Sequence, residues 1–278
     1  MTSAEEWSGR VGESWAAEWC RTDRSFTNLT PHLDAAIRDA APTRGKALDI
    51  GCGAGGTSLA LAEARPDLGI VGVDLSPDLL AVARERAQGR SGLRFVPGDA
   101  LRVAAEEAPV DFFYSRHGVM FFADPVAAFA AFRAAASPAA PLVFSCFRAV
   151  TDNCWASEVP GAILGAPPPE PQAGAPGPFA FADPERVASI LERAGWREVA
   201  HRAVDFGYRA GAGEDPVADA VAFFSRIGPA APLLRAAPED ERARMRERLA
   251  AVAERHRAGD VVEFSASAWI WSARAAEG

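Results

Sequence analysis

The chain has 278 residues and a formal net charge of −8, enough for one full α/β core with added segments. A pI near 5.2 argues against nucleic acid and anionic membrane surfaces as partners, because there is no basic field to gather a polyanion. Neither a membrane span, a signal segment nor metal-ligand spacing of Cys and His is apparent, so we expect a cytoplasmic protein with reduced thiols and no metal.

The first 45 residues predict a helical cover. Trp7, Val11, Trp15 and Trp19 are spaced four residues apart, which places them on one face of a single helix. A second helix is expected over 31–41, and the turn-forming segment 42–45 ends it. Alanine, glycine and proline are abundant and Lys46 is the only lysine, a composition typical of a GC-rich bacterium.

From residue 46 to 147 the chain alternates between predicted strands and helices. The strands are expected at 46–50, 70–74, 93–96, 110–115 and 141–147, and the helices at 55–65, 77–88, 100–106 and 124–136. Strands joined by crossover helices predict an α/β fold with a doubly wound, mostly parallel sheet. A helix and strand over 183–206, and a last strand in 261–278, add to this core.

Two insertions interrupt the alternation. Residues 148–182 are rich in proline, with 160–178 expected as a loop or lid, and 207–260 are expected to form a helical cap. Both follow the carboxyl ends of strands, where open α/β sheets bind ligands. Their aromatic side chains predict an apolar pocket wall: Trp155, Phe179, Phe181, Phe223 and Phe224.

The most informative segment is the glycine-rich turn after the first strand. Gly51 and Gly53 let the main chain turn sharply and approach a ligand, and Asp74, at the tip of the next strand, can accept from both ribose hydroxyls. Asp49 precedes the glycines. A carboxylate there disfavours a phosphate and suits a cationic nucleoside.

Four motifs at successive strand tips carry a family resemblance. They occupy 49–55, 72–76, 97–100 and 115–125, and together they resemble the class I S-adenosylmethionine-dependent methyltransferases of the small-molecule type, from about Trp7 to the last strand. The resemblance implies a Rossmann-like sheet of seven strands, the last of them antiparallel. S-adenosylmethionine also suits a carboxylate at Asp49, because it carries adenosine, an ammonium and a sulfonium but no phosphate.

The resemblance implies a role for each residue of these motifs. The main chain of Gly51, Cys52 and Gly53 would approach the methionine part, Asp49 would orient its amino group, and the Ser115 carbonyl would meet the ammonium. Asp74 would hold the ribose. Leu75 would flank the adenine, and the Gly98, Asp99 and Ala100 turn would bind its amino edge. The leading helix would bring Trp15 near the methionine end.

Some of these residues have simpler explanations. Leu75 suits an ordinary core position, Asp99 a cap for the following helix, and most of the tryptophan face core packing. Arg116 suits either an acidic substrate or a structural carboxylate such as Asp124.

The implied reaction is methyl transfer to the O, N or C atom of a small, partly apolar or aromatic acceptor. His117 is the candidate general base, because an imidazole titrates near neutral pH and the segment after the fourth strand borders the methyl group in this family. Relatives with this segment usually carry phenylalanine at that position. The alternative is therefore a histidine that only packs or hydrogen-bonds beside the cofactor.

Two other functions remain open from the sequence. A nicotinamide-dependent oxidoreductase shares the glycines and the Asp74-type acid, although Asp49 and Asp99 argue against it. A non-catalytic S-adenosylmethionine-binding protein would keep every motif. The chain is expected as a monomer or homodimer acting on a small molecule.

Overall fold

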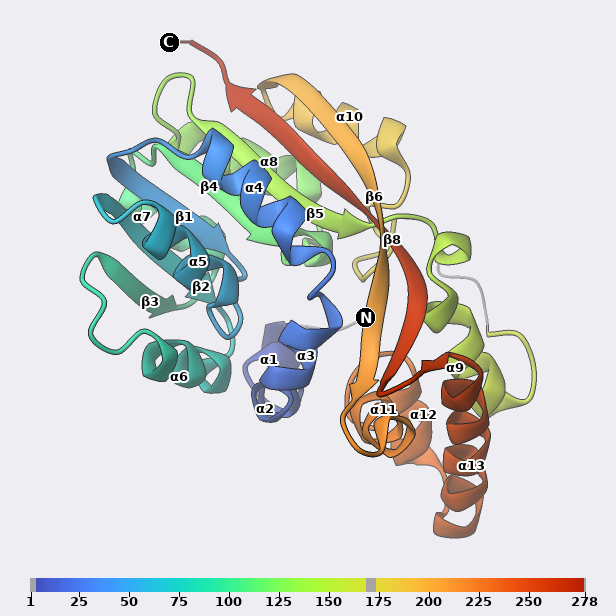
Figure 1. The fold of residues 1–278 in the computed structure, drawn as a ribbon. Helices are drawn as coiled ribbons and strands as arrows, with labels where there is room; N and C mark the ends of the chain where they lie inside the picture. Colours follow the sequence, from blue (N-terminus) through green and yellow to red (C-terminus); the bar gives the residue numbers. More distant parts are fainter. Residues whose placement is uncertain (1–3, 169–173, 278) are drawn as a thin grey trace.

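The computed structural model describes residues 4–168 and 174–277, which form a mixed sheet with helices on both faces (Figure 1). The strands are β1 Gly45–Ile50, β2 Leu68–Asp74, β3 Leu93–Pro97, β4 Phe112–Arg116, β5 Pro141–Phe147, β6 Trp196–Ala212, β7 Arg257–Ala258 and β8 Val261–Ala275. The α-helices are α1 Ala4–Trp7, α2 Arg10–Ala17, α3 Trp19–Ser25, α4 Thr30–Ala40, α5 Gly56–Ala64, α6 Pro77–Arg86, α7 Ala100–Glu107, α8 Pro125–Ala135, α9 Cys154–Leu164, α10 Pro184–Arg193, α11 Pro216–Phe224, α12 Ala230–Ala236 and α13 Glu239–Arg255. Short 3-10 turns cover Val119–Phe121 and Val150–Asp152.

The strand order is β3-β2-β1-β4-β5-β8-β6, and the sheet reverses its direction of winding between β1 and β4. Right-handed crossovers then place α5 and α6 on one face and α7, α8 and α10 on the other. The predicted doubly wound core is thereby confirmed. The reversal separates the loops that follow β1 and β4, and in sheets of this kind the ligand crevice forms there.

β8 lies between β5 and β6 and is antiparallel to both, as the resemblance implied. Beyond the sheet, β6 and β8 continue as a long pair that reaches the lobe of α9, α11, α12 and α13 (Figure 1). The cap therefore begins after Ala212 and not at 207. Burial alternates along this extension at Val204, Phe206, Tyr208 and Ala210, a strand pattern that the expected boundary cut short.

The N-terminal segment is not the single helix that the tryptophan spacing predicted. It breaks between α1 and α2 and again at Glu18, so Trp7 and Trp15 lie on different helices and Trp19 begins a third. Trp7 packs against Trp15 and Phe121, with ring centroids 5.6 and 5.4 Å apart. The breaks let α2 cross α6 closely.

The proline-rich insertion is more ordered than predicted. α9 runs to Leu164 and contains Pro160, so the expectation of a loop from 160 was wrong for its first turn. The buried side chains of Trp155, Val159 and Ile163 lie four residues apart and hold the helix against the cap, which outweighs the proline. Residues 169–173 of the expected loop lie outside the described part. Within the described ranges, no helix is both long and apolar enough to cross a membrane.

We predict that Gly12→Ala detaches the N-terminal cover. A Cβ at Gly12 would overlap the side chain of Ser76, the N-cap residue of α6, and the Trp7 carbonyl. Limited proteolysis within the first 25 residues should become several-fold faster while the core remains folded. Gly9→Ala is the matched control, because among the described residues its Cβ would meet only the Glu5 carbonyl, at 3.3 Å. Equal proteolysis rates in the two variants would contradict this packing.

Candidate active site

Ser115 ties the ends of β1 and β4 together. Its hydroxyl donates to the Ile50 carbonyl at 2.7 Å and accepts from the Gly118 N–H at 3.1 Å. A Cβ on Gly118 would lie 2.5 Å from that carbonyl, and one on Gly51 would lie 3.1 Å from the Gly118 Cα. The two loops of the crevice therefore approach main chain to main chain. The structure gives Ser115 a positioning role, and its expected carbonyl contact stays a prediction.

Gly53 leaves room for a ligand at the tip of the turn. It has a left-handed φ of 53°, and no heavy atom of the described residues lies within 4 Å of the position a Cβ would take. Its N–H donates to Asp74 Oδ2 at 2.8 Å, and the Ser76 N–H donates to Asp74 Oδ1 at 2.9 Å. The loop is thereby held open, and the remaining lone pairs of Asp74 are available to hydroxyl donors.

Asp49 is the most unusual ionisable group of the site. It is 1% exposed; its Oδ2 accepts from Ser58 Oγ at 2.6 Å, and its Oδ1 finds no partner among the described residues. Burial raises the pKa of Asp49 to about 7, against the lowering effects of Ser58 and Arg116. The sequence alone predicts a fixed negative charge at Asp49. In the fold it is a carboxyl that needs either a proton or a cation.

The other predicted cofactor residues lie around this crevice with local roles of their own. Asp99 is exposed and caps α7 by accepting from the Leu101 N–H at 2.7 Å, which is the simpler of its two expected roles. Gly98 has a φ of 143°, and Ala100 begins α7 beside it. Leu75 is partly buried after the tip of β2. Contacts of these residues with a nucleoside stay predictions.

Cys52 directs its side chain away from the crevice. The thiol packs in a small apolar cluster with Leu80, Ala83 and Phe95, and burial raises its pKa well above the ordinary value. The Cys52 N–H donates to the Val73 carbonyl at 3.0 Å. Cys52 is therefore an unreactive residue of the turn, available to a ligand only through its main chain.

Asp23 is a residue of the site that the sequence did not predict. Its carboxylate accepts from Arg116 at 2.6 Å and pairs with Arg86 at 2.9 Å, next to Gly56 at the start of α5. Burial works to raise the pKa of Asp23, but the two arginines outweigh it and the pKa lies below its usual range. Asp124, the partner suggested for Arg116, instead caps α8. No local signal connects residues so far apart in the chain.

The N-terminal cover also binds the cap. The almost fully buried Glu18 pairs with Arg226 at 3.0 Å, and Arg21 and Arg24 both reach Asp219 of α11, at 2.7 and 2.6 Å. Asp23, in the same short segment, makes its ion pairs on the side of the cofactor loop. The segment therefore connects the cofactor loop with the cap. Figure 1 shows α1–α3 between α6 and the cap lobe.

His117 is held in an uncommon conformation at the start of the β4 loop. Its φ is 58°, its N–H donates to the Ser145 carbonyl at 3.1 Å, and its Nδ1 lies 2.8 Å from Ser145 Oγ. Nε2 is buried without a partner in the described chain. Burial, helped by Arg116, lowers the pKa of His117 to about 3. The imidazole is therefore neutral, and a weak base in this state.

His117 belongs to a closed circuit of aromatic rings, which we call the ring cluster: His117, Phe26, Tyr208, Trp155 and Phe147. Successive ring centroids are 4.9, 5.8, 5.1, 5.3 and 4.4 Å apart around the circuit. The Trp155 Nε1 is a second buried polar atom without a partner in the part of the chain described. The cluster thus combines flat apolar faces with two free ring nitrogens.

The aromatic side chains predicted from the insertions divide between two places. Phe179 packs on Phe147 and Trp155 of the ring cluster, and Phe223 and Phe224 adjoin Tyr208. Phe181 differs in its neighbours, because it packs with Phe129 of α8 and Phe144 of β5 rather than with the ring cluster. Its expected place in the pocket wall was therefore wrong.

This crevice, with open glycines, an acid at the tip of β2 and a buried carboxyl, defines a nucleoside-binding α/β fold, and comparisons with known proteins name its class. A family model described as a methyltransferase domain matches residues 47–139. A demethylmenaquinone methyltransferase of Deinococcus radiodurans is 30% identical over 189 residues, 62% of this chain and 76% of that protein. The chain belongs to the class I S-adenosylmethionine-dependent methyltransferases. This family assignment argues against the alternative of a nicotinamide-dependent oxidoreductase.

Other similarities concern parts of the chain or the fold alone. A trans-aconitate 2-methyltransferase of Rhodopseudomonas palustris is 41% identical over 73 residues, 26% of this chain and 28% of that protein. The fold is similar to phosphoethanolamine N-methyltransferase 2 of Haemonchus contortus, solved with phosphomonomethylethanolamine and S-adenosylhomocysteine. The TM-score is 0.56 at 15% identity, and the match covers 100% of this chain and 61% of that one.

We predict that Asp49→Asn stabilises the ligand-free protein at pH 8 while weakening S-adenosylhomocysteine binding. With a folded pKa of about 7 against 3.8 unfolded, Asp49 lowers stability as pH rises from about 4 to 7, by up to about 4 kcal/mol. Thermal unfolding and calorimetry between pH 5 and 8 measure both effects. Wild-type affinity should fall below pH 7, because Asp49 must then lose a proton to meet the ligand ammonium.

The control for this substitution is Asp39→Asn, which removes a carboxylate that is 74% exposed. It should change neither the stability profile nor the affinity. If Asp49→Asn instead binds the ligand as tightly as the wild type at pH 8, Asp49 is not the partner of the ammonium.

Proposed function

We propose that the protein transfers the methyl group of S-adenosylmethionine to a small, uncharged acceptor that is aromatic or largely apolar. The observation that carries this proposal is the ring cluster. It is contiguous with the cofactor crevice through His117 and Gly118, and it holds two buried ring nitrogens without partners in the described chain. An unpaired buried donor or acceptor costs free energy unless a ligand satisfies it.

Two features of the crevice fit the cofactor. The free Oδ1 of Asp49 suits an ammonium, and the open space beside Gly53 admits the methionine part close to the main chain. Asp74 would hold the ribose hydroxyls, Leu75 and the 98–100 turn the adenine, and Trp15 would cover the methionine end. When bound, the cofactor supplies a methyl group already activated by its positive sulfur.

The chain's own task is then to position the acceptor and exclude water. Five segments contribute to the ring cluster: the end of α3, the β4 loop, the end of β5, α9 and β6. Flat rings that converge from so many elements favour a planar guest. The name of the Deinococcus radiodurans relative agrees with this proposal, because it gives demethylmenaquinone, a quinone, as that protein's acceptor.

Charged acceptors fit less well. Three arginines around the cap are already paired with acids: Arg148 with Asp152 and Asp205, Arg209 with Glu263, and Arg226 with Glu18. A carboxylate or phosphate acceptor would have to displace one of these acids and also desolvate against aromatic rings.

His117 would contribute a hydrogen bond to the acceptor. Ser145 decides its direction: if Ser145 Oγ donates to Nδ1, then Nε2 carries the proton and donates, and in the other tautomer Nε2 accepts from a hydroxyl or amine. A pKa of about 3 suits this positioning task better than proton abstraction at neutral pH. His117 would therefore act as a general base only towards acceptors that arrive with an acidic proton.

The first test is ligand binding. S-adenosylhomocysteine should raise the unfolding temperature by several degrees at 100 times its Kd, equivalent to about 2.7 kcal/mol, and NAD should not. Gly53→Ala should weaken the binding by about tenfold or more, because the methyl group fills the open space and strains a left-handed residue by about 1 kcal/mol. A shift with NAD alone would contradict the assignment.

The second test separates catalysis from binding alone. His117→Phe should lower turnover by about 100-fold with radiolabelled S-adenosylmethionine and a panel of phenols, hydroquinones and heteroaromatic amines, while cofactor Kd changes by less than about twofold. His117→Asn is a second variant, since asparagine tolerates the left-handed φ. Turnover equal to that of the wild type would remove His117 from the reaction.

Trp155→Phe probes the other free nitrogen. It should raise KM for the acceptor, and any loss of stability should come from reduced packing alone, because the Trp155 Nε1 has no hydrogen bond to lose in the described chain. Trp269→Phe is the matched control: its Nε1 donates to the Ala182 carbonyl at 2.9 Å, so that variant should lose about 1 kcal/mol. Tight cofactor binding with no transfer to any acceptor would favour the non-catalytic alternative.

A further inference from the structure

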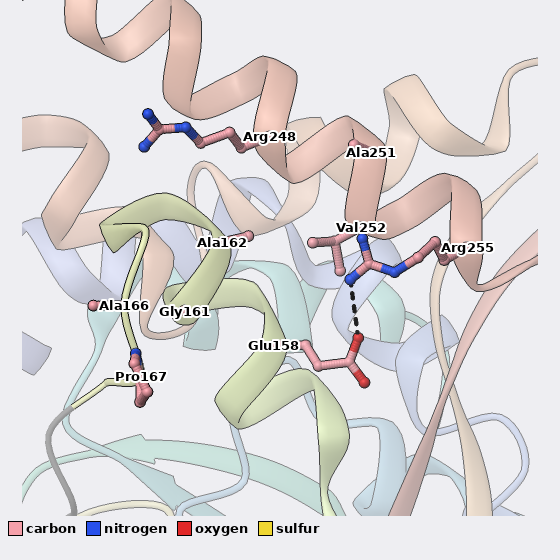
Figure 2. A pocket seen from close by; sticks show the side chains of 9 residues that line it. All are labelled: Glu158, Gly161, Ala162, Ala166, Pro167, Arg248, Ala251, Val252 and Arg255. Atoms are coloured by element: carbon pink, nitrogen blue, oxygen red, sulfur yellow. Dashed lines mark hydrogen bonds and ion pairs between the residues drawn. The ribbon is translucent and has the colours of Figure 1, made fainter.

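The cap holds a second recess, far from the cofactor loop. It lies between α9 and α13 and has a volume of about 500 Å³ (Figure 2). Its lining includes Glu158, Ala162 and Val252, with Arg248 and Arg255 at the rim. Figure 2 shows Glu158 reaching from α9 towards Arg255 on α13, at 3.5 Å.

Beside this recess three different metal-binding side chains converge. Cys154 and Glu158 lie one helical turn apart on α9, and His256 follows the last residue of α13. One donor atom from each lies within 4.8 Å of the others, and His256 Nε2 is 2.9 Å from Glu158 Oε2. The His256 ring is stacked on Phe264 at 4.1 Å, which fixes its orientation.

The donors match the chemistry of one ion. Zinc prefers thiolate, imidazole and carboxylate in a tetrahedron with bonds of about 2.0–2.3 Å, so neighbouring donor atoms lie about 3–4 Å apart. The observed spread therefore needs only small side-chain shifts. All three side chains are partly exposed, and Glu158 lines the recess, which offers an entry path.

We propose that Cys154, Glu158 and His256 form a Zn²⁺ site that joins α9 to α13, with a water molecule as the fourth ligand. On binding, the Cys154 thiol releases its proton to solvent and the thiolate coordinates the ion. Arg255, which is 62% exposed, turns outward into water and leaves the Glu158 carboxylate to the metal. The expectation of no metal site came from sequence spacing, but Glu158 and His256 lie 98 residues apart.

The site has a consequence for the acceptor pocket. Trp155 directly follows Cys154, so a metal that fixes the first turn of α9 also fixes an indole of the ring cluster. This consequence rests on the proposed function. Binding of the ion does not, because none of the three ligands belongs to the cofactor crevice or to the ring cluster.

The experiment is a Co²⁺ titration of the full chain, first freed of metals with a chelator that is then removed. The wild type should bind one Co²⁺ with a near-ultraviolet thiolate-to-cobalt charge-transfer band and the visible bands of a four-coordinate ion, and Zn²⁺ should bleach both. Cys154→Ser should abolish the charge-transfer band, and His256→Ala or Glu158→Gln should weaken Co²⁺ binding by more than about tenfold.

Cys20→Ser and His32→Ala are the matched controls, since Cys20 is exposed and both residues lie outside the cluster; they should bind Co²⁺ as the wild type does. Folding of every variant is checked by circular dichroism, which needs no ligand. If Cys154→Ser does not fold, Glu158→Gln and His256→Ala decide the question. The proposal is overturned if the wild type shows no charge-transfer band, or if the band survives in folded Cys154→Ser or vanishes in Cys20→Ser.

Discussion

The contact between the ends of β1 and β4 is the constraint on which the site depends. Ser115 joins Ile50 to Gly118 with two hydrogen bonds, and only glycine fits at Gly118 because of its closeness to the Ile50 carbonyl. That one contact sets the position of two things. It places the glycine loop that would receive the cofactor, and it places His117, the residue before Gly118, within the ring cluster.

The buried carboxyl of Asp49 shows how stability and binding oppose each other here. With one oxygen bonded to Ser58 and the other without a partner in the described chain, the group favours the protonated form in the ligand-free protein. A cationic ligand would supply the missing partner and reverse that preference. The free energy lost in the ligand-free protein would then be recovered on binding, a pattern expected where a site is optimised for its ligand rather than for the fold.

The ion pairs of the N-terminal cover link the two halves of the crevice. Asp23 is shared by Arg116 and Arg86 on the cofactor side, while Glu18 and two arginines bind the cap. Several of these charged groups are largely buried and paired with one another. The ion pairs therefore help to hold the N-terminal cover in position, in addition to hydrophobic burial. The cover consists of three short helices with different directions, and each carries one of the tryptophans Trp7, Trp15 and Trp19. For this reason the tryptophans do not share one helix face.

Local patterns in the sequence determined the α/β core, the glycine turn and the acids at the strand tips, because strand and helix periodicities and the carboxyl ends of parallel strands are properties of short segments. They also led to the correct family. Tertiary structure alone decided that Asp23 pairs with Arg116, that β6 extends to Ala212, that Phe181 belongs to the core, and that Cys154, Glu158 and His256 meet. Those outcomes depend on contacts between residues far apart in the chain, and no periodicity of a single segment records which distant surface it will meet.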